Sequence, residues 1–196
     1  MKPSQIFLLC LLLFACTTPK KNKDAIALLN ESIKVHDKNN NWRDAKLTIH
    51  IQEPRVSNPH RYSILKLDNM NGTFELSRNK ETHLAKYIID EKGKSSVLLD
   101  DGENIDSIFI KKYKLYPNRN SNYKKFYTML YGLPMSIPQY SETVSGGEEI
   151  IFNKEQCYKI QLKLKEPVIT KFWNVYISQK DNYVVGIEIF HEDDNQ

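Results

Sequence analysis

The sequence predicts an α+β protein built on one curved antiparallel β-sheet, an incomplete barrel, with an N-terminal helix and two central helices. Three observations predict this class. Short stretches alternate apolar and polar residues, most clearly residues 158–165. Turn residues rather than helices separate the first of these stretches, which favours hairpins over strand–helix–strand units. The 11 Tyr and 8 Phe suit the broad apolar faces of a sheet.

The first residues are typical of a bacterial lipoprotein signal. Lys2 is positively charged, residues 6–14 are apolar, and Ala15 precedes Cys16. The apolar run is shorter than the roughly 20 residues that a membrane span needs. We therefore expect residues 1–15 to be a signal peptide and Cys16 to become a lipid-carrying first residue. A secretory signal without lipidation and an uncleaved anchor are the alternatives.

After the signal, residues 16–22 are expected to form the lipidated cysteine and a tether, and residues 23–196 a single domain. Cys157 is then the remaining thiol, and its strand pattern predicts burial. The net charge of +4 is spread along the chain without a basic stripe, so we expect no nucleic-acid partner. We expect the domain to be a monomer.

The elements follow in order along the chain. Residues 23–36 predict a helix, because Ile26, Leu29 and Ile33 fall on one face and Asn22 or Asp24 can cap its start. Trp42 is expected to open the first strand, at residues 42–51. Alternation and turn signals such as Asn71-Gly72 predict four further strands, at residues 61–67, 73–78, 84–89 and 96–99.

The middle of the chain changes from strands to helices. A helix is expected to begin near Asn104, and a second to cover residues 123–131, ending at Gly132 before Pro134. A loop through residues 146–147 follows. The last strands are expected at residues 150–152, 158–165, 172–178 and 184–190, before a polar tail at residues 191–196.

The sequence contains no recognisable catalytic machinery. The five His have no helical ligand spacing, and no Cys-x-x-Cys, nucleophile elbow or phosphate-binding loop is present. We therefore expect no metal, no cofactor and no enzyme activity. His36 and Asp37 are the one pair that resembles a base and its orienting carboxylate. An interaction at the helix terminus is the favoured interpretation of that pair.

The helix at residues 123–131 carries more aromatic surface than one helix face needs. One interpretation is that this helix forms a wall of a ligand cavity, where it covers a curved sheet and encloses an apolar molecule. The favoured alternative is ordinary core packing. The candidate ligand-binding residues are Tyr123, Phe126, Tyr127, Leu130, Tyr131 and Met135.

Residues 32–42, SIKVHDKNNNW, and residues 126–135, FYTMLYGLPM, resemble the signature segments of an uncharacterised family of Bacteroidota lipoproteins. The matching signature residues are His36, Asp37, Trp42, Gly132 and Pro134. In architecture the chain is more distantly similar to the lipoprotein carriers LolA and LolB, which hold acyl chains in an incomplete barrel. Similarity to known lipoproteins implies sorting to the outer membrane, since no Asp follows Cys16. The basic residues 17–21, TTPKK, differ from the acidic segments expected for export to the cell surface, which favours the periplasmic face.

Together these features predict a lipid-anchored envelope lipoprotein without enzyme activity. Its expected role is to bind an apolar or amphiphilic ligand, such as a lipid or a lipoprotein acyl chain. An envelope module that binds another protein and no small ligand is the alternative. A hydrolase that uses His36 and Asp37 is the least favoured reading.

Overall fold

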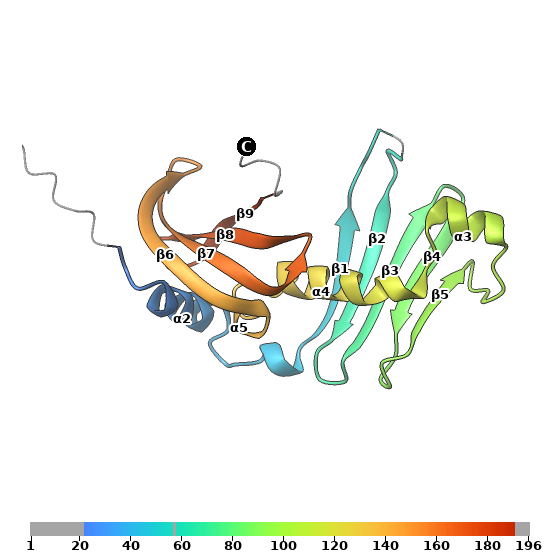
Figure 1. Cartoon of the computed structure of the whole chain (residues 1–196), viewed down its shortest axis with the longest axis horizontal. Helices are drawn as coiled ribbons and strands as arrows, with labels where there is room; N and C mark the ends of the chain where they lie inside the picture. The colour runs from blue at the N-terminus through green and yellow to red at the C-terminus, as the bar shows by residue number, and fades with distance from the viewer. Residues whose placement is uncertain (1–21, 57, 191–196) are drawn as a thin grey trace, which may run out of the picture.

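Two antiparallel β-sheets with a helical segment between them form the described part of the protein (Figure 1). The computed structural model describes residues 22–56 and 58–190. The first sheet has five strands in chain order: β1 Lys46–Gln52, β2 Tyr62–Asp68, β3 Thr73–Lys80, β4 His83–Ile89 and β5 Ser95–Leu99. The second has four: β6 Ser141–Phe152, β7 Glu155–Val168, β8 Thr170–Ser178 and β9 Val184–Ile189.

In the described residues, four helices cover or connect these sheets: α2 Ala25–His36, α3 Ser107–Tyr113, α4 Asn120–Tyr131 and the short α5 Ile137–Tyr140. Two 3₁₀ turns lie at Trp42–Asp44 and Pro117–Arg119. Helix α2 lies beneath β6, and α4 runs from the first sheet towards the second (Figure 1). The α+β class and the N-terminal and central helices are therefore confirmed.

Helix α2 begins at the predicted cap, but its predicted apolar face is only partly right, because Leu29 is buried whereas Ile26 is 57% exposed. The Asp24 side chain accepts hydrogen bonds from the N–H groups of Ile26 and Ala27, at 2.9 and 3.4 Å, which satisfies donors that lack a partner inside the helix. Leu28 and Leu29 are buried. Each such side chain contributes on the order of 2 kcal/mol by leaving water, so packing rather than helix propensity holds α2 in place.

Helix α4 belongs to both hydrophobic cores. Met129 is buried with Trp173 and α2 in the core of the second sheet. Tyr127, two residues before Met129 and so on nearly the opposite face of the helix, is buried with Leu76 and Tyr87 in the core of the first sheet. Because α4 contributes buried side chains to both cores, it fixes how the two sheets meet.

The prediction of one curved sheet is wrong, because the strands form two separate sheets that do not close into a barrel. Each strand pairs with its sequence neighbour, so the predicted meander holds within each sheet. The pairing stops between β5 and β6, where the helical segment intervenes. Alternation shows which face of a strand is buried, but it does not show which strands share a sheet.

The loop predicted at residues 146–147 is also wrong, because Gly146 and Gly147 lie inside the 12-residue strand β6. The register shifts by one residue there, and both glycines have positive φ, as in a β-bulge. Lys23 N donates to Gly147 O at 3.1 Å, and a Cβ on Gly147 would lie 1.9 Å from the Lys23 carbonyl oxygen. The glycines therefore let the start of α2 approach β6.

Other predicted boundaries differ by a few residues. Trp42 lies in a 3₁₀ turn rather than opening β1, and the helix expected from Asn104 begins at Ser107. The predicted signal peptide at residues 1–15, the lipidated Cys16, most of the tether and the polar tail lie outside the described residues.

The two segments that carried the family resemblance meet in space. A Cβ on Gly132 would lie 2.3 Å from Cζ2 of Trp42 and 2.5 Å from Thr128 O, so the indole packs against the bare glycine at the end of α4. We expect Gly132→Ala to lower the free energy of unfolding by about 1–3 kcal/mol through overpacking. Urea unfolding followed by circular dichroism measures this loss.

Gly102→Ala is the matched control for that substitution. The nearest atom to its added Cβ is Leu99 O at 3.4 Å, which is ordinary contact, and we expect a change within about 0.5 kcal/mol. Equal stability losses in the two variants would contradict the close packing of Trp42 on Gly132.

Candidate functional site

A pocket of about 590 Å³ opens between the two sheets, above α4. We call it the inter-sheet pocket. It combines a charged side, from the end of the first sheet, with an aromatic and aliphatic side, from α4 and the turn between β7 and β8. Its lining residues are Glu53, Arg55, Arg61, Arg78, Asn122, Tyr123, Lys125, Phe126, Tyr127, Pro167, Val168 and Ile169.

Arg78 is a buried charge in this pocket, with 6% of its surface exposed. Its Nε donates to Ser63 Oγ at 2.8 Å, and its Nη2 donates to Tyr127 OH at 2.6 Å and to Glu53 Oε2 at 3.1 Å. A buried guanidinium is stable only when it is paired and hydrogen-bonded. These three partners, on β2, α4 and the segment after β1, hold Arg78 in one position.

Arg61 shares the same carboxylate but makes poorer interactions. Its Nε lies 3.0 Å from Glu53 Oε2, yet the N–H is not aligned with that oxygen, so the buried Nε has no hydrogen-bond partner among the described residues. The pKa of Arg61 is lowered, first by burial and then by the neighbouring Arg78 charge. A single carboxylate, Glu53, therefore faces two guanidinium groups.

Strand register explains why these charges come together. Ser63 on β2 pairs with Arg78 on the antiparallel strand β3. Arg61, two residues before Ser63 and just outside β2, and Lys80, two residues after Arg78, therefore fall on the same face. On β3 that face begins with the buried Phe74 and Leu76. The apolar stripe of the first sheet thus ends in a group of cations.

Lys80 is a half-buried member of this group and forms no ion pair within residues 22–56 and 58–190. Its pKa is lowered to about 8, first by burial and then by repulsion from nearby cations, namely Arg78, Arg61, Arg119 and Lys114. The folded state therefore binds this proton less well than the unfolded chain does. At pH 7 the charged amine destabilises the fold.

We expect Lys80→Met to raise the free energy of unfolding at pH 7 by about 1 kcal/mol, a figure reduced for solvent screening of the half-exposed amine. Between pH 8 and about 10.5 the unfolded chain binds more protons at Lys80 than the folded protein does. The wild type should therefore regain stability relative to the variant across that window. Urea unfolding at pH 7, 8, 9 and 10 measures the difference.

Lys66→Met controls for the loss of a lysine on the same sheet. Lys66 lies on the outer face of β2 and pairs with Glu75 at 3.1 Å, so its removal should give no stabilisation at pH 7. A gain for Lys80→Met that does not change with pH would contradict the charge-repulsion account.

The apolar side of the pocket comes from α4 and the turn between β7 and β8. Tyr123 and Phe126 are half-buried on α4, and the Phe126 ring meets the buried Trp173 ring edge-on at 6.5 Å between centroids. Ile169 lies at the turn with 57% of its surface exposed. Its φ of +67° places a β-branched residue in the left-handed region, which costs on the order of 1–2 kcal/mol.

The structure separates the six candidate ligand-binding residues. Tyr123, Phe126 and Tyr127 line the inter-sheet pocket, although Tyr127 is also a core residue. Tyr131 stacks on Tyr127 at 6.1 Å between centroids and lines none of the pockets described, as is the case for Leu130. Met135 lines a different hollow, beside Trp42 and Tyr140. Arg61 and Arg78 were not identified as pocket residues from the sequence. Phe74 and Leu76 point into the core, and because alternate residues of a strand share a face, their positions implied that residue 78 points inward too.

The remaining signature residues have structural partners. The Asp37 carboxylate accepts hydrogen bonds from the N–H groups of Asn41 and Trp42, at 2.7 and 2.9 Å. The Nδ1 atom of His36 lies 3.0 Å from Ser32 O. The Asp37 carboxylate therefore caps the turn after α2, and the contacts of these two side chains do not join them as a base and its orienting carboxylate. Pro134 is buried in the segment that joins α4 to α5.

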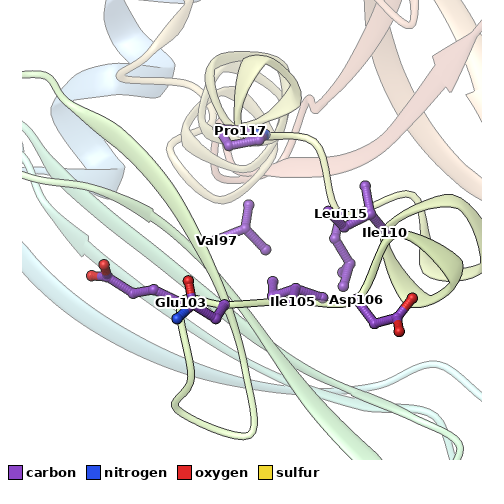
Figure 2. Close-up of a pocket in the computed structure, with 8 residues that line it drawn as sticks. Val97, Glu103, Ile105, Asp106, Ile110, Leu115 and Pro117 are labelled. Carbon is purple, nitrogen blue, oxygen red and sulfur yellow. The ribbon is translucent and has the colours of Figure 1, made fainter.

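A second hollow, of about 480 Å³, lies at the edge of the first sheet near β5 and α3 (Figure 2). Val97, Ile105 and Leu115 line it, and Figure 2 shows the Glu103 and Asp106 carboxylates directed away from them. Asp106 caps α3 by accepting from Ile108 N at 2.7 Å. Because its acidic groups point outward, this hollow is the weaker candidate for a ligand.

Other reactive groups in the described residues are engaged or buried. His83 Nδ1 lies 2.6 Å from Asp100 Oδ2, a pair that joins β4 to the exposed turn after β5. The His83 hydrogen bond and the Leu84 N–H lower the pKa of Asp100. Cys157 is buried as expected, and burial raises the pKa of its thiol, which makes it a poor nucleophile.

Residues 22–56 and 58–190 contain neither a cluster of metal ligands nor a membrane-spanning helix. No group of three or more His, Cys, Asp or Glu side chains there is placed to hold a metal ion. In the same residues, no helix has the length and apolar character needed to cross a bilayer.

The family model that matches this chain covers residues 2–196 and describes DUF6503, a family of unknown function. No curated protein and no solved structure matches the chain. An uncharacterised family is therefore confirmed, whereas its restriction to Bacteroidota lipoproteins and the likeness to LolA and LolB stay predictions. Since the match spans nearly the whole sequence, the chain belongs to the DUF6503 family.

Proposed function

We propose that this protein is a lipid-anchored lipoprotein of the outer membrane, facing the periplasm, that binds an amphiphilic ligand without reacting with it. The inter-sheet pocket is the observation that carries this proposal. It places guanidinium groups and apolar rings around one space, so it matches a molecule with a polar end and an apolar chain. Its volume falls within the range of about 300–1,000 Å³ typical of small-molecule sites.

Ile169 supports a binding role for the turn between β7 and β8. The residue exposes an apolar side chain at the pocket and does so in a left-handed backbone conformation that glycine would adopt without strain. Strain of this kind persists where another requirement outweighs stability. Contact with the apolar part of a ligand is such a requirement.

Native mass spectrometry of the chain extracted without detergent tests the proposal. We expect a bound amphiphile that leaves on denaturation. Ile169→Gly should retain several-fold less of it while keeping its unfolding free energy within about 1 kcal/mol, because relief of strain offsets the entropy that glycine adds to the unfolded chain. Ile151→Gly is the control, since Ile151 is 66% exposed and lies outside the pocket.

An empty protein that also takes up no amphiphile on titration would contradict the proposal. That result would favour the envelope interaction module instead. Equal ligand retention in the two glycine variants would place the binding site away from the turn between β7 and β8.

The lipid anchor makes its own prediction. Cys16→Ser should release the domain from washed membranes or leave the precursor unprocessed, because a single sulfur carries the acyl chains that hold it there. Cys10→Ser, a substitution in the apolar run of the same signal, should leave the protein in the membrane fraction. Fractionation followed by immunoblotting measures both. Normal-sized Cys16→Ser protein in the membrane fraction would contradict the anchor.

A further inference from the structure

We infer that the polar end of the ligand is an anion, a carboxylate or a phosphate monoester, and that Arg61 binds it with Arg78 and Lys80 beside it. This inference rests on the proposed function and names the chemical class of its ligand. The opposite end of the ligand would lie along the aromatic and aliphatic side of the same pocket.

The charge balance of the pocket supports an anion. Glu53 is the one carboxylate among its described lining residues, and it faces both Arg61 and Arg78. Lys125 forms its ion pair with Glu166. It therefore does not compete with Arg61 and Arg78 for the Glu53 carboxylate. Arg55 and the nearby Lys80 add further positive charge without ion pairs in the described residues. An entering anion would therefore meet an excess of cations, of which Arg61 and Arg78 are largely shielded from water.

The hydrogen-bond geometry identifies Arg61 as the residue with donors to offer. Arg78 already donates to Ser63, Glu53 and Tyr127 and is fixed by them. The Arg61 side chain donates no hydrogen bond within the described residues, although a guanidinium has five N–H donors. An oxyanion can accept two of these donors at once, which is the strongest mode of arginine recognition.

The energetics of Lys80 point the same way. A half-buried amine among four other cations lowers stability, so its retention needs a compensating interaction. No described side chain supplies one. An anion bound at Arg61 would neutralise part of the group and stabilise Lys80 as well. The same anion would leave its alkyl chain beside Tyr123 and Phe126 on α4, because both groups line one pocket.

Isothermal titration calorimetry with four probes, the amphiphiles kept below their critical micelle concentrations, tests this inference. The probes are dodecanoate, dodecyl phosphate, uncharged dodecyl maltoside and inorganic phosphate. We expect both anionic amphiphiles to bind at least tenfold more tightly than dodecyl maltoside. Inorganic phosphate should bind at least tenfold more weakly than dodecyl phosphate, because it lacks the chain that contacts the apolar side.

Arg61→Met should weaken binding of both anionic amphiphiles about tenfold and leave dodecyl maltoside unchanged. Arg43→Met, an exposed arginine outside the inter-sheet pocket, is the matched control and should change neither. Arg61→Lys keeps the charge without the planar fork and should give an intermediate loss. Near-ultraviolet circular dichroism confirms that each variant is folded before titration.

The outcomes distinguish the anion inference from the proposed amphiphile binding. Equal binding of charged and uncharged probes, unaffected by Arg61→Met, would overturn the anion inference and leave amphiphile binding standing. If inorganic phosphate bound as tightly as dodecyl phosphate, the site would be one for a free anion. That result would overturn the inference that the bound anion is the polar end of an amphiphile. Binding of none of the four would overturn the proposed function together with the inference.

Discussion

Trp173→Ala should lower the free energy of unfolding by about 4 kcal/mol, the largest loss that we expect from a single substitution in this protein. Trp173 is fully buried in the core of the second sheet, where its removal leaves a cavity that neighbouring side chains cannot fill. Its Nε1 also donates to Val168 O at 3.0 Å, which ties the turn between β7 and β8 to the core. Urea unfolding monitored by far-ultraviolet circular dichroism measures the loss.

Trp173→Phe separates the two contributions. It keeps an aromatic ring in the core and removes the hydrogen bond to Val168, so we expect a loss of about 1–3 kcal/mol. If the pocket depends on that bond, the phenylalanine variant should also bind ligand less well than its stability loss explains. A Trp173→Ala loss below about 1 kcal/mol would show that Trp173 does not hold the second core together.

Glu53→Gln should lower the free energy of unfolding by about 3 kcal/mol. The substitution removes the carboxylate that faces Arg61 and Arg78 in the described residues and leaves the buried Arg78 charge uncompensated. Because the Glu53 side chain is itself 30% exposed, we take the low end of the cost of breaking a buried ion pair. Arg78 cannot relax into water, because Ser63 and Tyr127 hold it inside the protein. Chemical denaturation at pH 7 and low salt measures the effect.

Glu75→Gln is the matched control on the neighbouring part of the same sheet. Glu75 pairs with Lys66, whose side chain is mostly exposed, and surface pairs of this kind contribute at most about 1 kcal/mol. Similar losses in the two variants would mean that the pair at Glu53 is screened by water, and the cationic side of the pocket would then not be a low-dielectric site.

Much of the first sheet could be predicted from local patterns. The strands β1 and β2 alternate clearly, and polar turns such as that at Asn71-Gly72 separate the strands that follow, so side-chain periodicity and turn residues indicate the same elements. The start of α2 was equally clear, because Asp24 is a strong cap before an apolar face. Where several local signals coincide, the element follows from them.

The errors arose where tertiary contacts decide the structure. Gly146 and Gly147 have the composition of a loop, and only the approach of the Lys23 carbonyl explains why they lie in a strand. The division into two sheets depends on α4, whose Tyr127 and Met129 enter different cores. No local pattern encodes that division.

The candidate site was predicted in part, for a related reason. Its aromatic side lies on one helix, so Tyr123, Phe126 and Tyr127 stand out as a periodic group. Its cationic side is assembled from different strands, and the pairing of Ser63 with Arg78 is needed to bring Arg61 and Lys80 to one face. Register is a property of the folded sheet, which is why sequence reasoning missed the charges.

The most direct test of the central claim, that an amphiphile binds between the two sheets, is paramagnetic nuclear magnetic resonance. Stearate with a nitroxide near its carboxylate is titrated into the labelled protein. We predict that amide signals of Arg61, Tyr123 and Ile169 broaden first and most, while those of Val97 and Ile105, at the hollow in Figure 2, lose less intensity. Broadening confined to Val97 and Ile105, or none at saturating ligand, would contradict the account.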